Sequence, residues 1–334
     1  MAAVENGERP LEADRLADDD QLLEVGFLLI HDFALYTLSS AIDVLRHANR
    51  FAGRRRYLTR VYTEDGDPAM SSNRLEIKAD RALEETARPW KLFVVCGFHP
   101  ERVTDDKILG WLRKVGRRGT DLGGISAGAF VLARAGLLEG YECAVHWEYA
   151  GAFEEMWPDV ALTDRLYVID RDRQTCAGGA ATVDMFLRIV ADDLGPDIAA
   201  KAAEQMLVDR VRTTLDRQTS AALFRAKSRS GALAEAIEAM EHNLDAPLSM
   251  IEIATTVGLT RRQLHRLFRE HTGQSPTDFY RDIRLRYARN LLRQTPSKVI
   301  DVALASGFGS HSHFSKVYRE HFGVSPLKDR RSDL

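Results

Sequence analysis

The C-terminal third of the chain contains one sequence unit twice, and this repeat limits the possible folds more than any other feature. In each copy a short apolar stretch ends at a glycine, a second apolar-periodic stretch follows, and another glycine precedes a Ser-Pro pair. The first copy contains Ala254, Gly258, Leu264, Phe268, Gly273 and Ser275-Pro276, and the second contains Ala303, Gly307, Phe314, Tyr318, Gly323 and Ser325-Pro326. The offset is 49 residues up to the first glycine and 50 after it, so one residue near Gly309 has been added.

Each copy has the pattern of a helix-turn-helix motif. The first helix is expected to end at Gly258 or Gly307, because glycine adopts the left-handed conformation at no steric cost. The second helix of the first copy should begin after Thr260, a good N-cap residue, and that of the second copy after Ser310 or Ser312. The sequence therefore predicts an all-α C-terminal domain with two such motifs.

The exposed face of each predicted second helix is polar and basic. Arg and Gln side chains can hydrogen-bond base edges, and Lys, Arg and Ser can hold phosphates. A charged helix face is often merely solvated, but two tandem motifs can reach major-groove segments about one turn (~34–36 Å) apart. The candidate DNA-binding residues are Thr260, Arg261, Arg262, Gln263, His265, Arg266 and Arg269 in the first copy, and Ser310, His311, Ser312, His313, Ser315, Lys316 and Arg319 in the second.

Charge is distributed unevenly along the chain. The net charge is -3 overall, yet residues 261–334 hold 15 Lys and Arg against 7 Asp and Glu. The basic excess therefore lies where DNA contact is predicted, and neutralisation of phosphates should make binding depend steeply on salt.

The run RRQLHRLFREHTGQSPTDFYRDIRLRYARNLLRQT, followed by IDVALASGFGSHSHFSKVYREHFGVSP, resembles the DNA-binding domain of the AraC/XylS family of transcription regulators. The resemblance covers about residues 231–330. It implies seven helices, with a joining helix from Pro276 or Thr277 to about Gln294. It also implies three partners: double-stranded promoter DNA, RNA polymerase and a second copy of the chain in a homodimer. Separately, some arginines are expected to form intradomain salt bridges instead of contacting DNA, Arg286 on the joining helix among them.

The N-terminal half alternates strand-like and helix-like stretches. Short apolar runs typical of buried strands occupy residues 24–30, 57–63, 91–97 and 121–125, and amphipathic stretches typical of helices occupy residues 38–51, 105–115 and 127–135. This alternation predicts an α/β domain, with a flavodoxin-like parallel sheet covered by helices on both faces.

A sharp turn is predicted at residues 124–128 (GISAG), between a strand and a helix. Glycines on both sides permit the strained elbow that raises a side chain, here Ser126, over the carboxyl edge of a sheet. The backbone N–H groups of Ala127 and Gly128 are expected to point outward there, where an anion is favoured.

The elbow, the AVHW segment at 144–147 and the CAGGAATVDMFL segment at 176–187 resemble the ThiJ/PfpI, class I glutamine-amidotransferase-like domain over about residues 24–195. Enzymes of that fold carry a cysteine at the elbow, whereas this chain has Ser126. A serine hydrolase would need an acid between the serine and His146, where only Glu139 and Glu142 occur. The chain is therefore expected not to be an enzyme, the alternative being an amidotransferase- or hydrolase-like enzyme fused to a DNA-binding domain.

A non-catalytic elbow could instead bind a small molecule, because open α/β sheets bind ligands beyond the carboxyl ends of their strands. The candidate effector-binding residues are Ser126, Ala127, Gly128, His146, Trp147, Glu148 and His99. The two domains together resemble the GlxA-type branch of the AraC/XylS family. The His-Trp-Glu triplet resembles regulators of glycine-betaine or carnitine catabolism, and the elbow serine resembles arginine-responsive relatives. The resemblance thus implies an activator of a catabolic operon with a quaternary-amine or amino-acid effector.

The remaining segments complete the predicted organisation. Residues 1–21 are polar and acidic, which is typical of a disordered tail rather than a signal peptide. Residues 22–195 form the ThiJ/PfpI-like domain, 196–230 a helix (197–215) and a linker with a hinge at 227–231, and 231–330 the DNA-binding domain. Cys96, Cys143 and Cys176 lack metal-binding spacing and are expected to be buried thiols in a cytoplasmic protein with no metal or cofactor.

Overall fold

A computed structural model describes residues 22–84, 86–218, 226 and 230–331 of the chain. The predicted disordered tail at 1–21 and hinge residues 227–229 lie outside these ranges. The chain divides into two compact units, the first formed by residues 1–146 and 159–217 and the second by residues 147–158 and 218–334.

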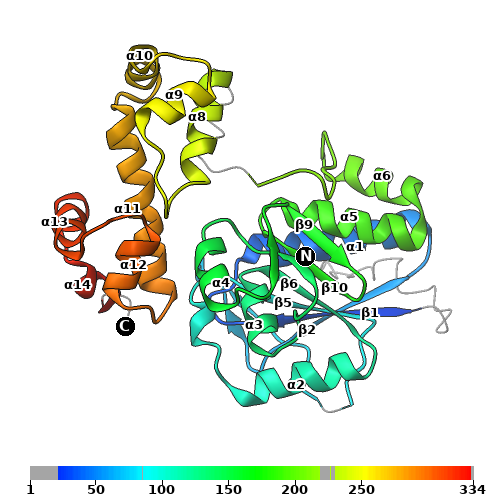
Figure 1. Ribbon diagram of the computed structural model, residues 1–334. Helices are drawn as coiled ribbons and strands as arrows, with labels where there is room; N and C mark the ends of the chain where they lie inside the picture. Colours follow the sequence, from blue (N-terminus) through cyan, green and yellow to red (C-terminus); the bar gives the residue numbers. More distant parts are fainter. Residues whose placement is uncertain (1–21, 85, 219–225, 227–229, 332–334) are drawn as a thin grey trace, which may run out of the picture. The chain divides into compact units, whose positions relative to one another are not determined.

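The first unit is built on a six-stranded sheet in the order β2-β1-β5-β6-β10-β9 (Figure 1). Its strands are β1 (Leu23–Leu29), β2 (Tyr57–Tyr62), β5 (Lys91–Cys96), β6 (Asp121–Ser126), β9 (Tyr167–Asp170) and β10 (Arg173–Cys176). All neighbouring strands pair in parallel except β9, which runs antiparallel to β10. The predicted flavodoxin-like α/β class is confirmed, and the four predicted strands are β1, β2, β5 and β6.

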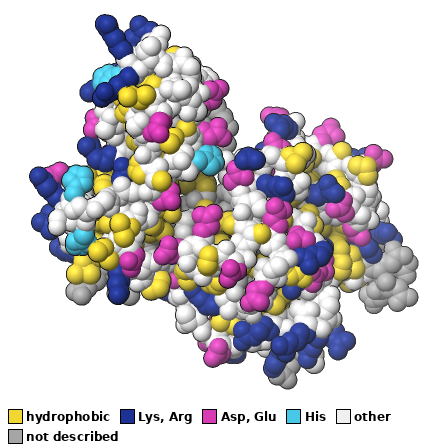
Figure 2. Space-filling view, viewed as in Figure 1, with side chains coloured by type: hydrophobic (Ala, Val, Ile, Leu, Met, Phe, Trp, Pro, Cys, Tyr) yellow, Lys and Arg dark blue, Asp and Glu magenta, His cyan; other side chains and the backbone are white. Residues whose placement is uncertain are grey.

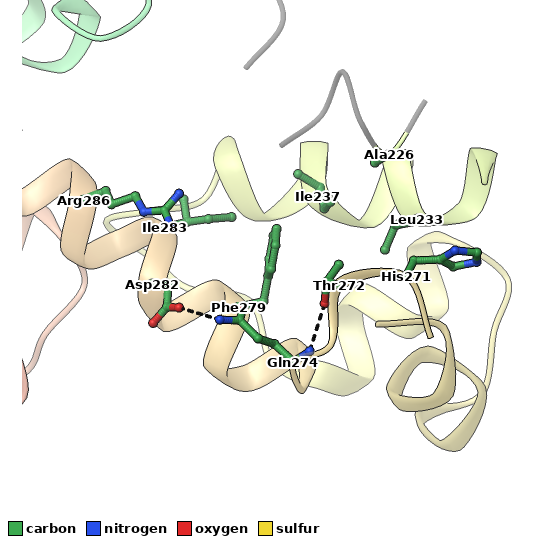
Figure 3. A pocket seen from close by; sticks show the side chains of 10 residues that line it. All are labelled: Ala226, Leu233, Ile237, His271, Thr272, Gln274, Phe279, Asp282, Ile283 and Arg286. Carbon is green, nitrogen blue, oxygen red and sulfur yellow. Dashed lines mark hydrogen bonds between the residues drawn. The ribbon is translucent and has the colours of Figure 1, made fainter. Parts of the chain in front are cut away.

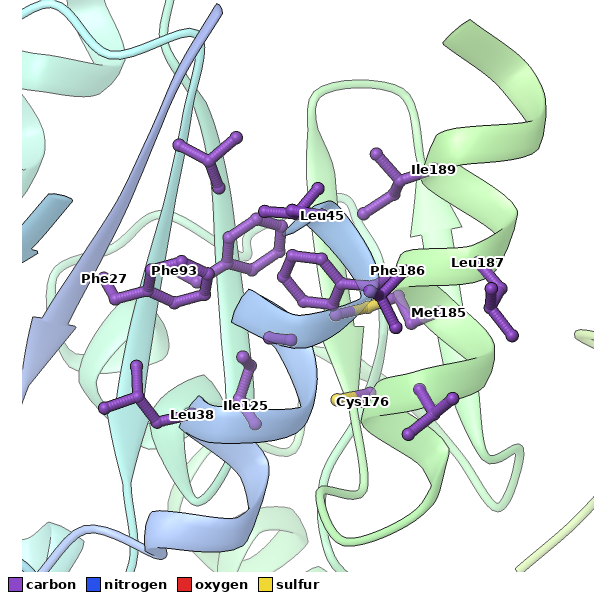
Figure 4. Close-up of a cluster of buried hydrophobic side chains, with 14 of the residues drawn as sticks. Phe27, Leu38, Leu45, Phe93, Ile125, Cys176, Met185, Phe186, Leu187 and Ile189 are labelled. Carbon is purple, nitrogen blue, oxygen red and sulfur yellow. The ribbon is translucent and has the colours of Figure 1, made fainter. Parts of the chain in front are cut away.

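Helices cover both faces of this sheet (Figure 1). On one face α1 (Leu35–Ala52), α5 (Ala181–Leu194) and α6 (Pro196–Gln205) pack together, and on the other lie α2 (Asp106–Arg117) and α3 (Gly128–Arg134). The rings of Phe27, Phe93 and Phe186 join the sheet to α5, with centroids 4.7 Å apart for the closest pair (Figure 4). Burial of such rings is a main source of the stability of the unit.

Several short elements were not predicted from the sequence. They are β3 (Ala69–Met70) and β4 (Glu76–Ile77), the 3-10 turn η3 (Pro100–Arg102), and β7 (Glu142–Ala144) and β8 (Ala161–Thr163), which flank α4 (Ala150–Met156). Strands of two or three residues leave no measurable alternation in the sequence, so their pairing depends on tertiary contacts.

The second unit contains seven helices between residues 231 and 331, as the AraC/XylS resemblance implies. They are α8 (Gly231–Glu241), α9 (Met250–Thr256), α10 (Arg261–Thr272), α11 (Pro276–Gln294), α12 (Val299–Ala305), α13 (His311–Phe322) and α14 (Pro326–Arg331). The long α11 lies between a first lobe, α8 to α10, and a second lobe, α12 to α14 (Figure 1). It begins and ends as predicted.

Two predictions about the connecting region are wrong. The helix expected over 197–215 ends at Gln205, because Leu207 takes a left-handed backbone (φ 55°) and the following chain is irregular. Met206 and Val208 still pack on the core from this non-helical segment, so their spacing misled the prediction. Ser230, predicted in the hinge, instead caps α8 by accepting the backbone N–H of Leu233.

Candidate functional site

The first helix-turn-helix motif forms as its sequence predicts. Helix α9 is followed by Gly258 with φ 66°, and α10 starts at an N-cap formed by Thr260. Thr260 and Gln263 form a capping box, in which each side chain bonds the other residue's backbone N–H. Leu264 and Phe268 are buried, which directs the remaining face of α10 to solvent.

The second motif repeats this geometry. Gly307 has φ 71° between α12 and α13, and Phe314 and Tyr318 are buried. Of the two predicted starting residues, Ser310 is the N-cap and accepts the backbone N–H of His313, whereas Ser312 lies in the first turn of α13. The added residue Gly309 lies in the turn, so the extra length is absorbed outside both helices.

The candidate DNA-binding residues on the two recognition helices, α10 and α13, are exposed. All fourteen have this property except Ser315, which is half-buried. Figure 2 shows Lys, Arg and His side chains gathered over α10 and over α13. Two contacts refine the prediction, since the Gln263 side-chain oxygen is engaged in the capping box and Arg269 donates to the carbonyl of Gly273, 3.2 Å away.

The salt bridge predicted for Arg286 is not found among the described residues. Arg286 is exposed and borders a cavity of about 280 Å³ in the first lobe. Its neighbours Arg289 and Arg293 make the pairing instead, both with the buried carboxylate of Asp329.

The predicted elbow exists in the first unit. Ser126 has φ 60°, a strained conformation for a residue with a side chain. Gly178 allows it, because a Cβ at Gly178 would lie 2.7 Å from the Cβ of Ser126. Among the described residues, the Ser126 hydroxyl has no hydrogen-bond partner.

The predicted anion-binding amide at Ala127 is wrong. The Ala127 N–H donates to the carbonyl oxygen of Cys96, 3.2 Å away. This happens because the pairing of β5 with β6 reaches Cys96 and Ser126, so the backbone bonding continues one residue into the turn. Gly128 is buried against β5, where an added Cβ would meet the carbonyl oxygen of Val94 at 2.1 Å.

The other candidate effector residues occupy different surroundings. His146 is half-buried, and this burial lowers its pKa. Trp147 is 47% exposed, and both Trp147 and Glu148 belong to the segment 147–158 of the second unit. His99 follows β5, has a left-handed backbone and places Nδ1 3.1 Å from Glu101 Oε1.

A cavity of about 400 Å³ opens at the carboxyl ends of β1, β2 and β5. His99 is the one candidate effector residue that lines it. Its polar lining is mainly acidic, with Asp32, Glu64, Asp65, Asp67 and Asp105 beside His31, His99 and Arg102, and the exposed ring of Phe98 adds an apolar surface. Among the described residues, the carboxylates of Asp32 and Asp67 have no hydrogen-bond or ion-pair partner.

Helix α3, which follows the elbow, supports the wall of this cavity. The guanidinium of Arg134 donates to the carbonyl oxygens of Pro100, Glu101 and Val103 at 2.7–3.2 Å. The acidic lining was not predicted from the sequence. The available signal was the run of acids at 64–67 directly after a predicted strand, the place where α/β sheets bind ligands.

Three observations bear on other chemistry. Cys96, Cys143 and Cys176 are buried free thiols, as predicted, and burial raises the pKa of Cys176 to about 11. Within the described residues, no cluster of His, Cys, Asp and Glu could hold a metal ion, and no helix is long and apolar enough to cross a bilayer.

Two family models match the chain. The DJ-1/PfpI family matches residues 24–192, and a helix-turn-helix domain matches residues 253–332. The chain is 42% identical to the HTH-type transcriptional regulator CdhR of Pseudomonas aeruginosa, over 91% of this chain and 90% of that protein. It is 36% identical to the HTH-type transcriptional regulator GlxA of Rhizobium meliloti, over 94% and 98%.

A solved structure of an AraC family transcriptional regulator from Pseudomonas putida aligns with a TM-score of 0.51 and 27% identity, covering 55% of this chain and 99% of that one. An α/β domain joined to paired helix-turn-helix motifs with exposed basic helices defines a class of protein, the DNA-binding transcription regulators. Within that class, the chain belongs to the AraC-type regulators that carry a DJ-1/PfpI domain, the group of CdhR and GlxA.

Proposed function

We propose that this regulator activates a catabolic operon in response to a small quaternary-amine or amino-acid effector, whose positively charged group binds the first unit at the carboxyl edge of its sheet. The observation that carries the proposal is the acidic cavity beyond β1, β2 and β5. Among the described residues, the half-buried Asp32 and the exposed Asp67 present carboxylates to it without a protein partner, and carboxylates attract cations. Glycine betaine, carnitine and arginine all carry a positively charged nitrogen group, which the acidic lining would attract, together with a carboxylate.

The elbow supports a binding role rather than a catalytic one. The end of β6 pairs with the end of β5, so Ser126 lies on the strand next to the cavity loops. Ser126 has no base bonded to its hydroxyl among the described residues, and a serine nucleophile needs one. We therefore assign it no chemistry, and leave His146, Trp147 and Glu148 as further candidates for effector contact.

The DNA-binding unit would then act on promoter DNA in the cytoplasm. Homodimerisation and contact with RNA polymerase are proposed on the AraC/XylS resemblance. The effector can shift the equilibrium between DNA-binding states by no more than its differential affinity for those states.

Calorimetric titration of the full chain tests the effector proposal. The ligands are glycine betaine, carnitine, dimethylglycine and arginine, which all carry a positively charged nitrogen, and glutamate is the control with a net negative charge. We expect saturable binding of at least one of the four ligands, weakened by Asp32→Asn and by Asp67→Asn. Asp159→Asn, an exposed residue away from the cavity, is the matched control. Absence of binding by all four ligands would refute the proposal, and sensitivity only to Ser126→Ala and Trp147→Ala would place the ligand outside the cavity.

A further inference from the structure

The two recognition helices belong to different lobes, and α11 joins them (Figure 1). A helix of 19 residues fixes how far apart its ends lie. It does not by itself fix the angle at which each lobe sits on it, since that depends on side-chain contacts along its length. Three residues in the N-terminal half of α11 make such contacts.

Arg284 binds α11 to the turn of the second motif. Its Nε donates to the carbonyl oxygen of Ser306 at 2.8 Å, and its Nη2 donates to that of Gly307 at 2.5 Å. The guanidinium also stacks 4.3 Å from the ring centroid of Phe308. A half-buried, planar group with two hydrogen bonds and a stacked face holds the turn in one orientation.

Tyr280, one helical turn earlier, holds the first lobe at the same place. Its hydroxyl donates to the carbonyl oxygen of Asn243 and accepts the backbone N–H of Leu248, 3.3 Å away. These residues belong to the connection that leads into α9. The two lobes also touch directly there, because a Cβ added to Gly307 would lie 2.5 Å from the carbonyl oxygen of Leu244.

Asp282 forms a second bridge. One carboxylate oxygen accepts from the side-chain amide of Gln274, at 3.0 Å, immediately beyond the first recognition helix (Figure 3). The other oxygen lies 3.4 Å from Nδ1 of His321, near the end of the second recognition helix. Asp282 therefore connects the C-terminal ends of α10 and α13 through one side chain.

We propose that these contacts, which we call the α11 clamp (Tyr280, Asp282, Arg284 and Gly307), determine the spacing of the two DNA sub-sites that one chain reads. The clamp fixes the angle between α10 and α13. One added base pair moves a sub-site by about 3.4 Å along the DNA and rotates it by roughly 35°. If the angle between α10 and α13 is fixed, the chain should bind poorly to DNA whose sub-sites are one base pair further apart. If the contacts are weakened, the angle can change and both spacings should be bound.

Selection of binding sites from random duplex DNA by the full chain tests the proposal. Wild-type protein should recover two different sub-sites at one fixed spacing. Arg284→Met keeps an apolar stem over Phe308 but removes both hydrogen bonds, and should recover the same two sub-sites at spacings that vary by one base pair. On the selected site, a one-base-pair insertion should weaken wild-type binding by about tenfold or more and Arg284→Met binding by less than about threefold.

Arg286→Met is the control. It removes the same charge from α11, but Arg286 is exposed and, among the described residues, forms no hydrogen bond with either lobe. This variant should keep the single spacing. Circular dichroism and thermal melting establish that each variant folds. If Arg284→Met does not fold, Asp282→Asn serves as an independent variant, because it weakens the contacts of Asp282 with Gln274 and His321. Retention of one spacing by the folded Arg284→Met or Asp282→Asn chain would overturn the clamp. Recovery of a single sub-site by wild-type protein would overturn both the clamp and DNA reading by two helices.

Discussion

Asp329 is the buried acceptor on which the C-terminal end of the second lobe depends. Its side chain is 2% exposed, and it lies 2.8 Å from both Arg289 Nε and Arg293 Nη2. It also accepts the hydroxyl of the fully buried Tyr318 at 2.6 Å. One carboxylate thus joins α11, α13 and α14.

Replacement of Asp329 by Asn keeps the size of the side chain but removes its charge. Loss of one partner from a buried ion pair costs about 3–5 kcal/mol. The two arginine side chains are 34% and 32% exposed and can be hydrated, so we expect the lower end, about 3 kcal/mol. For a domain of about 100 residues this corresponds to a fall in Tm of roughly 12–24 °C.

Hydrogen exchange measured on peptides from α11, α13 and α14 of the full chain reports this loss locally. Asp301→Asn, an exposed acid in the first turn of α12, is the control and should cost less than about 1 kcal/mol. A loss below about 1 kcal/mol for Asp329→Asn at pH 7 would refute the assigned role.

The pH dependence supplies an independent check. Burial alone would raise the pKa of Asp329, but the hydrogen bonds from Tyr318, Arg289 and Arg293 outweigh it and hold the pKa below its ordinary value. A group with a depressed folded-state pKa stabilises the fold above its unfolded pKa, about 3.9, and loses that contribution as the pH falls. The stability gap between wild type and Asp329→Asn should therefore be full at pH 7 and narrow below about pH 4.

Three further predictions concern single side chains. Arg262→Ala or Arg266→Ala should weaken specific DNA binding by about 1–3 kcal/mol if the side chain reads a base in bidentate fashion; fluorescence anisotropy at fixed salt measures this, and unchanged affinity in both variants would contradict base reading. Gln263→Ala should instead cost about 1 kcal/mol of stability through the lost capping box, with base preference unchanged in a site selection. Burial lowers the pKa of His146, so its neutral form stabilises the fold above about pH 6.5 and this contribution falls at lower pH. In the His146→Gln variant, the free energy of unfolding should therefore fall less between pH 7 and pH 5 than in the wild type. An equal fall in both proteins would contradict this role of His146.

The DNA-binding half could be predicted closely because its signals are local. Glycine stops, N-cap residues and apolar spacing act within a few residues, so both motifs followed from the repeat. The bounds of α11 agree with those that the AraC/XylS resemblance implied. The failed helix over 197–215 has the opposite cause. Apolar residues such as Val208 reach the core from irregular chain, a tertiary arrangement that periodicity does not distinguish from a helix.

The effector site was harder to predict because its parts come from distant segments. Asp32, Asp67 and His99 follow three different strands, and only the sheet order brings them to one cavity. The prediction at Ala127 was wrong because its backbone N–H donates to the carbonyl oxygen of Cys96 and is therefore not available to an anion. The hydrogen bonding between the strands extends one residue further into the turn than we predicted. Such a detail depends on strand register, which the sequence of one strand does not contain.

The capping box at the start of α10 has a consequence for the thermodynamics of DNA recognition. Thr260 and Gln263 satisfy each other's backbone N–H groups without any contribution from a phosphate, so the helix is already formed before it meets DNA. Segments that fold on binding bind more weakly because ordering the chain costs free energy, and their binding shows a large negative change in heat capacity. This preorganised helix should avoid both, and its association with DNA should be limited by encounter and electrostatic steering rather than by folding.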